Sequence, residues 1–163
     1  MERIWAPWRM KYIESGAQGE GCIFCVGSDA SRDEEKYVLH RADLVFTMLN
    51  AFPYTSGHLM IAPYRHVADP ALMNEEELSE MMAEAVFMLK VLRKAFQPEG
   101  FNLGINIGKP AGAGIADHAH LHIVPRWGGD TNFMPVLADT RIIPQALADT
   151  YKKLKQATEG MGQ

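Results

Sequence analysis

The feature that most constrains the fold is the alternation of histidine with apolar residues in the stretch "DHAHLHIVP", residues 117–125. Neighbouring side chains of a β-strand point to opposite faces of a sheet. The alternation therefore predicts a strand whose core-facing residues are Ala119, Leu121 and Ile123. The other face carries His118, His120 and His122, with consecutive histidines about 6.6 Å apart.

Three of the six histidines of the chain stand in this run. A solvated edge strand is the simplest alternative, but threonine, lysine or glutamate would serve such a face equally well. Neutral imidazole is a nitrogen nucleophile near neutral pH, because its ordinary pKa is about 6.5. It can attack phosphorus and form a covalent phosphoramidate. The run therefore predicts a site where one histidine attacks a phosphate and its neighbours donate hydrogen bonds.

The loop before this strand, "GKPAGAG" at residues 108–114, is rich in glycine. Backbone N–H groups can approach an anion closely where no side chain obstructs them. The loop is not a P-loop, because Pro110 follows Lys109 where that motif requires Ser or Thr. Many strand connections favour glycine, so the loop alone is a weak phosphate signal.

The rest of the chain predicts one α+β domain over its 163 residues, a length that can bury a core. Further strands are expected in a hairpin at 37–50, at 58–63 and at 100–108. Asn74, followed by three glutamates and an apolar stripe, predicts the start of one long helix. Pro144 predicts the start of a C-terminal helix that ends near Ala157.

Two end segments are expected to differ from this central domain. Residues 1–36 are rich in glycine and charge, which predicts an irregular arm, and residues 128–163 form a C-terminal extension. The first residues lack a continuous apolar segment, and no run of about 18 apolar residues follows. With 16 basic and 20 acidic residues, no broad basic face is expected. The sequence predicts a cytoplasmic protein that binds neither membranes nor nucleic acid.

The only two cysteines form the pair "CIFC", Cys22 and Cys25. Without an export signal, this spacing favours metal binding or redox chemistry over a structural disulfide. A redox dithiol would need a thioredoxin-like strand-to-helix context, which is not visible here. Zinc is therefore favoured, with two inert reduced thiols as the alternative. Tetrahedral zinc requires two further nitrogen or sulfur ligands.

Two stretches together resemble the histidine-triad (HIT) family of nucleotide hydrolases and transferases. They are "HAHLHIVPR" at 118–126 and "NAFPYTSGHLMIAP" at 50–63, and the resemblance covers about residues 20–127. The segments "WAPWRMKYI" and "WGGDTNFMPVLADTRIIPQAL" are similar to a bacterial branch, the diadenosine tetraphosphate phosphorylases. The resemblance implies an antiparallel five-stranded half-barrel sheet with one long helix. It also implies a homodimer, with a tetramer as the alternative.

The resemblance also implies roles for single residues. His120 would be the nucleophile on the α-phosphorus, and His122 would bind the phosphate and assist the leaving group. The implied substrate-binding residues are Asn50, His58, Asn106, Gly112, Gly114 and His118. Asn50 would bind the ribose hydroxyls, or alternatively be a strand-ending turn residue. Many family members have Gln and then Ser or Thr where this loop has Ala113, Gly114 and Ile115. Backbone N–H groups would have to replace that side-chain contact.

For the metal, the resemblance implies a structural zinc ion on four residues. These are Cys22, Cys25, His66 and His118, with His40 as the spare ligand. Magnesium would accompany the nucleotide substrate. On this interpretation His118 binds the metal, while His120 and His122 take part in the reaction.

The function implied is conversion of diadenosine tetraphosphate and phosphate to ADP and ATP through a nucleotidyl-histidine. Candidate phosphate anchors are Arg3, Arg9, Lys11, Lys109 and Arg126, although such cations are more often solvated. One alternative is a HIT hydrolase, acting on dinucleoside polyphosphates or as an adenosine phosphoramidase. Another is a zinc-stabilised nucleotide-binding module without turnover. A cupin-like oxygenase would need a glutamate soon after the histidines, and "LHIVPRWGG" has none.

Overall fold

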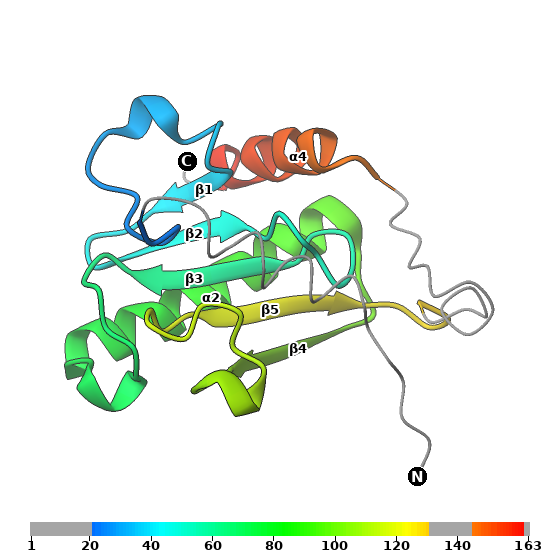
Figure 1. Ribbon diagram of the computed structural model, residues 1–163. Helices are drawn as coiled ribbons and strands as arrows, with labels where there is room; N and C mark the ends of the chain where they lie inside the picture. The colour runs from blue at the N-terminus through cyan, green and yellow to red at the C-terminus, as the bar shows by residue number, and fades with distance from the viewer. Residues whose placement is uncertain (1–20, 131–144, 162–163) are drawn as a thin grey trace, which may run out of the picture.

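The computed structural model describes residues 21–130 and 145–161. Its centre is a five-stranded antiparallel sheet with the strand order β1-β2-β3-β5-β4 (Figure 1). The strands are β1 (Val38–Arg41), β2 (Val45–Leu49), β3 (Leu59–Pro63), β4 (Gly100–Ile105) and β5 (Leu121–Arg126). Two α-helices lie in the described ranges, α2 (Glu75–Phe96) and α4 (Leu147–Glu159). The predicted α+β class with a five-stranded antiparallel sheet is confirmed.

The strand register decides which side chains share a face with the histidines. Met60 of β3 and Gly104 of β4 both stand directly opposite His122 of β5. Directly opposite residues of antiparallel strands point to the same side of the sheet. Gly104 therefore adds no side chain to the histidine face, where β4 runs beside β5.

The two faces of the sheet are covered by different parts of the chain. The long helix α2 crosses one face, behind the sheet in Figure 1, and buries Met81, Ala85, Met88 and Leu92 against it. The sheet contributes Leu59, Ile61, Leu121 and Ile123 to this core, and Ala119 joins it from the segment before β5. The histidine face has a smaller apolar cluster, made of Phe24, Val26, Val38, Phe46, Met48, Met60 and Ala62.

Helix α2 begins where the sequence predicts. The side chain of Asn74 accepts a hydrogen bond from the Glu77 N–H, and the Glu77 carboxylate accepts one from the Asn74 N–H. This reciprocal capping box satisfies two N–H groups that the first turn leaves unpaired. Arg65 donates to the same carboxylate and thereby lowers the pKa of Glu77.

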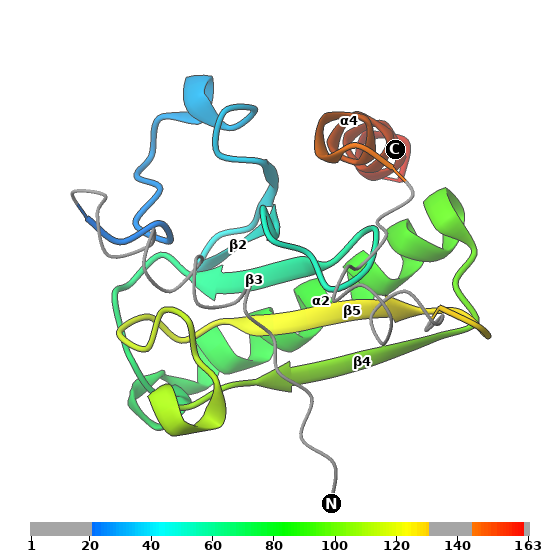
Figure 2. The ribbon, with the colours of Figure 1, turned by 45° about the vertical axis from the view of Figure 1, so that its right-hand side comes forward.

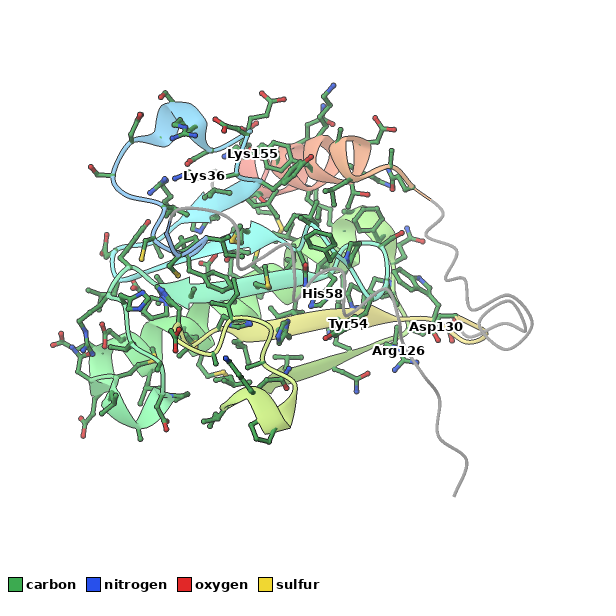
Figure 3. The ribbon with its side chains drawn as sticks, viewed as in Figure 1. Lys36, Tyr54, His58, Arg126, Asp130 and Lys155 are labelled. Carbon is green, nitrogen blue, oxygen red and sulfur yellow. The ribbon has the colours of Figure 1, made fainter. Side chains whose placement is uncertain are left out.

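Helix α4 lies beside β1 (Figure 1) and also packs against α2, to which it lies close in Figure 2. The Tyr151 hydroxyl donates to the Val38 carbonyl, and the Lys155 ammonium donates to the Leu39 carbonyl. Figure 3 shows Lys155 on α4 beside β1. These side chains satisfy carbonyls that a bare strand edge would expose. The predicted helix start at Pro144 lies outside the described residues, and the observed helix begins at Leu147, after an N-cap without a side-chain bond.

The predicted bounds of two strands are wrong. Strand β4 ends at Ile105 instead of residue 108, and β5 begins at Leu121 instead of residue 117. Residues 117–120 are held by the chain that follows β3, because the Ala119 N–H donates to the Val67 carbonyl. Only His122 of the three histidines therefore lies in a regular strand.

The described part of the predicted irregular arm, residues 21–36, contains only one short 3-10 turn, η1 (Ala30–Arg32). Residues 1–20, together with residues 131–144 and 162–163 of the predicted extension, fall outside the described ranges. Within those ranges, no helix has the length and apolar character needed to cross a membrane.

Candidate active site and metal cluster

The histidine run is covered, which the alternation alone does not reveal. His118 is 1% exposed and His120 is 4% exposed, while His122 is half-buried. The cover includes Phe24, whose ring stacks on His120 with centroids 4.5 Å apart and planes at 28°. Desolvation disfavours a charged imidazole, so this environment favours neutral rings.

His120 is held in one tautomer by the backbone. Its Nδ1 lies 2.8 Å from the carbonyl oxygen of His118. A carbonyl can only accept, so we assign the proton to Nδ1, which leaves a lone pair on Nε2. Burial lowers the pKa of His120, and the hydrogen bond to His118 offsets part of that effect. A neutral imidazole with an unprotonated Nε2 is the form that can attack phosphorus.

His122 is held in the opposite tautomer by a relay. The Tyr54 N–H donates to Nδ1 of His58 over 3.1 Å, so the proton of His58 must be on Nε2. That Nε2 lies 2.9 Å from Nδ1 of His122, which therefore accepts. The proton of neutral His122 is consequently on Nε2. Figure 3 shows Tyr54 and His58 together beside β5.

The rings of His120 and His122 lie 4.7 Å apart at 73°. The first ring has an unprotonated Nε2 and the second a protonated one. A ring that can act as a nucleophile thus stands beside a ring that can donate a proton, and displacement at phosphorus uses two such groups. His58 is fully buried and contacts His122, and its implied role in substrate binding stays a prediction.

Four of the predicted metal ligands meet in one cluster. One ligand atom from each of Cys22, Cys25, His66 and His118 lies within 4.8 Å of the others. The Cys22 sulfur is 3.4 Å from Nδ1 of His118, and the Cys25 sulfur is 3.4 Å from Nδ1 of His66. Tetrahedral zinc places sulfur and nitrogen ligands about 3.5 Å apart, as its bond lengths of about 2.3 and 2.0 Å require. The donor set and its spacing fit zinc.

His118 faces the cluster because its other nitrogen is already engaged. Nε2 donates to the Pro63 carbonyl over 2.8 Å, which leaves Nδ1 as the possible metal-binding atom. Burial lowers the pKa of His118, which keeps the ring in the neutral form that binds metal. With both nitrogens directed to protein groups, the position does not suit the additional substrate contact expected for His118. The spare ligand His40 lies elsewhere and pairs with Glu84.

The segment that carries the cysteines is anchored from the strand that follows it. The Cys25 N–H donates to the Cys22 carbonyl, which closes a tight turn. Lys36 donates to the Val26 carbonyl, and Arg41 donates to the Gly27 carbonyl. Arg41 also pairs with Asp33. The Lys36 and Arg41 contacts hold Val26 and Gly27, the residues just after the cysteine turn.

Several residues expected to contact the ribose and the phosphates instead make hydrogen bonds within the protein. Asn50 is buried, and its side-chain oxygen accepts a hydrogen bond from the Phe52 N–H over 2.8 Å. This contact is typical of a turn residue at the end of a strand. The amide nitrogen of Asn50 lies 3.4 Å from Nδ1 of His58. The Asn106 side-chain amide donates to the Gly112 carbonyl, while the Gly112 N–H donates to the backbone carbonyl of Lys109. Gly114 is exposed in this loop, and its phosphate contact stays a prediction.

Of the five candidate phosphate anchors, Arg3, Arg9 and Lys11 lie outside the described residues. Lys109 is exposed in the short turn η3 (Lys109–Ala111). Arg126 is already engaged, because it makes two hydrogen bonds to Asp130 and one to Asn102. Figure 3 shows Arg126 beside Asp130 at the end of β5. This pairing weakens the case for Arg126 as a phosphate anchor.

Two site features were missed by the sequence reasoning. Phe24 lies between the cysteines in "CIFC", so its position is readable, but nothing in the sequence shows that its ring stacks on His120. Tyr54 acts through its backbone N–H, and a backbone contact leaves no signal in residue identity.

Comparison with known proteins identifies the class. The HIT domain model matches residues 31–129, and the chain belongs to the HIT family. An AP-4-A phosphorylase from Mycobacterium tuberculosis is 38% identical, with 98% of this chain and 84% of the relative covered. A bis(5'-adenosyl)-triphosphatase from Dictyostelium discoideum is 29% identical, with 55% of this chain and 59% of the relative covered.

The fold is likewise that of solved histidine triad proteins. A zinc-bound histidine triad family protein from Mycobacterium smegmatis superposes with a TM-score of 0.67 at 23% identity. The match covers 87% of this chain and 96% of that protein. A histidine triad nucleotide-binding protein from Sulfolobus tokodaii gives a TM-score of 0.66 at 23% identity, with 86% and 93% covered.

Proposed function

We propose that this chain is a nucleotidyltransferase that converts diadenosine tetraphosphate and inorganic phosphate into ADP and ATP. The observation that carries the proposal is the pair of opposite tautomers, with an unprotonated Nε2 on His120 beside a protonated Nε2 on His122. The relative named AP-4-A phosphorylase supports this choice of substrate, since its match extends over 98% of the chain.

The reaction proceeds in two displacements. Nε2 of His120 attacks the α-phosphorus, the bond from phosphorus to the bridging oxygen breaks, and ATP departs. His122 donates its Nε2 proton to the departing oxygen. The Nδ1 hydrogen bond from His120 to the His118 carbonyl stabilises the positive charge that develops on the attacking ring. A phosphate oxygen then attacks the nucleotidyl-histidine, the phosphorus–nitrogen bond breaks, and ADP is released.

The remaining site residues serve the same two steps. His58 acts through His122, because its hydrogen bond fixes which nitrogen of His122 carries the proton. Asn50 shapes the turn beside His58 and remains a candidate for the ribose contact. Asn106 and the backbone of Gly112 and Gly114 form the loop assigned to the phosphates.

We assign a structural zinc ion to the cysteine and histidine cluster. The 3.4 Å sulfur-to-nitrogen distances support it, as does the zinc-bound relative from Mycobacterium smegmatis. Zinc bound there would supply no reaction chemistry, because all four tetrahedral positions would be taken by protein. Magnesium is expected only as a companion of the nucleotide.

We also propose a homodimer. Helix α2 exposes Leu78, Met82 and Val86, which recur every four residues on one face. Strand β4 forms the sheet edge opposite the one covered by α4, and it exposes Leu103. A second copy would bury both features at once, and sedimentation analysis tests this. The cytoplasmic location expected from the sequence stays a prediction for cell fractionation.

The decisive experiment supplies diadenosine tetraphosphate with isotopically labelled phosphate. A phosphorylase incorporates the label into ADP and forms little AMP. Bound phosphate must then outcompete water at about 55 M, which requires that it be held in place. AMP and ATP without label would assign the chain to the hydrolases. Binding of diadenosine tetraphosphate without formation of any product would favour the alternative of a nucleotide-binding module without turnover.

A further inference from the structure

Phe24 occupies an unusual place, since it stands between the two cysteines in sequence and on the nucleophile in space. Its ring is 1% exposed and lies 4.5 Å from the His120 ring at 28°, and 5.3 Å from the His118 ring at 48°. The side chain of the adjacent Ile23 is 43% exposed. The turn therefore directs one apolar side chain onto the nucleophile and the other outward.

His120 needs a second restraint besides its hydrogen bond. The bond from Nδ1 to the His118 carbonyl holds the ring at one atom. The torsion that rotates an imidazole about its Cβ–Cγ bond is broad and has no sharp preference of its own. Phe24 covers one face of the ring, and His122 stands 4.7 Å away at 73°. The attacking nitrogen is thus aimed by Phe24 and His122 together.

The position of Phe24 depends in turn on the metal cluster. Cys22 and Cys25 flank it, and their sulfurs reach His118 and His66 at 3.4 Å. Thiols make weak hydrogen bonds, whereas four metal bonds would fix both ends of this turn. Lys36 and Arg41 anchor only the residues after it, at Val26 and Gly27. Metal binding by Cys22 and Cys25 would therefore fix the turn next to the ring of His120.

We propose that Phe24 is a positioning residue that couples occupancy of the metal cluster to the orientation of His120. The inference rests on the proposed role of His120 as nucleophile. His118 offers a parallel route, because its ring faces the cluster while its carbonyl holds His120. A variant that keeps the metal but loses the aromatic ring separates the two routes.

The test uses the full chain, zinc and nitrogen-15 NMR of the histidine rings, with no nucleotide present. Zinc-loaded wild type is expected to show His120 in a single Nδ1-protonated tautomer, and removal of zinc is expected to give a mixture of tautomers. Phe24→Leu is expected to bind one zinc ion per chain and still show the mixture. Its kcat should fall about tenfold with KM little changed, because aim affects the reacting geometry more than binding.

The matched control is Ile23→Leu, which alters the exposed neighbour in the same turn and should match wild type in every readout. The inference is overturned if zinc removal leaves the wild-type His120 tautomer unchanged, or if zinc-loaded Phe24→Leu keeps it. The wild-type zinc titration stands even if Phe24→Leu does not fold. Because the NMR readout needs no turnover, failure of the proposed reaction would show separately as absence of a nucleotidyl adduct.

Discussion

His118 and His120 are two residues apart and both buried, yet the fold gives them different chemistry. Both nitrogens of His118 face protein groups, the Pro63 carbonyl and the Cys22 sulfur. Among the described residues, His120 directs only Nδ1 to a protein hydrogen-bonding group, the carbonyl of His118 itself. Under the proposed function, the backbone carbonyl that each ring contacts, that of Pro63 for His118 and that of His118 for His120, decides whether the imidazole faces the metal cluster or the substrate. We call these two parts the metal end and the reaction end.

The largest expected effect falls on the reaction end. His120→Ala should lower kcat by at least about a thousandfold, because it removes the attacking nitrogen. The core-facing residues of β5 are untouched, so folding and zinc content should persist. Steady-state assays with circular dichroism and elemental analysis measure this. His40→Gln is the matched control, since His40 pairs with Glu84 away from the site. More than a few per cent of wild-type activity in His120→Ala would refute the assignment.

His58→Phe tests the relay within the reaction end. Phenylalanine fills the buried space but cannot donate to Nδ1 of His122, so the proton of His122 is no longer held on Nε2. We expect kcat to fall about a hundredfold, the lower part of the range for lost acid–base assistance. A substrate with a better leaving group should lose less. Equal losses for good and poor leaving groups would place the role of His58 elsewhere.

Cys22→Ser tests the metal end. The variant should lose zinc and about 2–3 kcal/mol of folding stability, because a bound metal contributes directly to folding. At temperatures where the chain stays folded, kcat should fall only about tenfold, since the nucleophile remains. Elemental analysis and thermal unfolding measure the first two effects. A metal-free wild type with an unchanged melting point would remove the metal end from the account.

The smallest expected effect lies outside both ends. Glu77→Gln should cost about 1 kcal/mol at neutral pH, because it weakens a charged hydrogen bond in the capping box. Arg65 lowers the pKa of Glu77 from 4.5. The carboxylate's contribution to folding stability is therefore fully present above pH 4.5. It is lost as the pH falls through the lower pKa that Glu77 has in the folded protein. Denaturant unfolding should show the wild type and variant converging in acid, with kcat unaffected near neutrality.

Sequence reasoning predicted the strands of the sheet and helix α2, because alternation and capping are local patterns. Spacing singled out only Cys22 and Cys25 as metal ligands, whereas His66 and His118 were implied by the family resemblance, and the structure brings all four together. Sequence reasoning did not predict the burial of the histidines. Part of the cover over these histidines comes from Phe24, which lies far from them in the sequence. The neighbouring contact between Cys22 and His118 spans 96 residues. Sequence reasoning also placed the start of β5 too early, since the Val67 carbonyl captures the Ala119 N–H. Backbone contacts of this kind depend on three-dimensional placement and not on residue identity.

The most direct test of the division between the two ends is to map the covalent adduct. Wild-type protein is mixed with labelled diadenosine tetraphosphate in the absence of phosphate and quenched in alkali, where phosphoramidates survive better than in acid. Peptide mass spectrometry then locates the label. The account predicts an AMP group on His120 and none on His118 or His122. Label on His122, or turnover of the substrate with no histidine labelled, would contradict it.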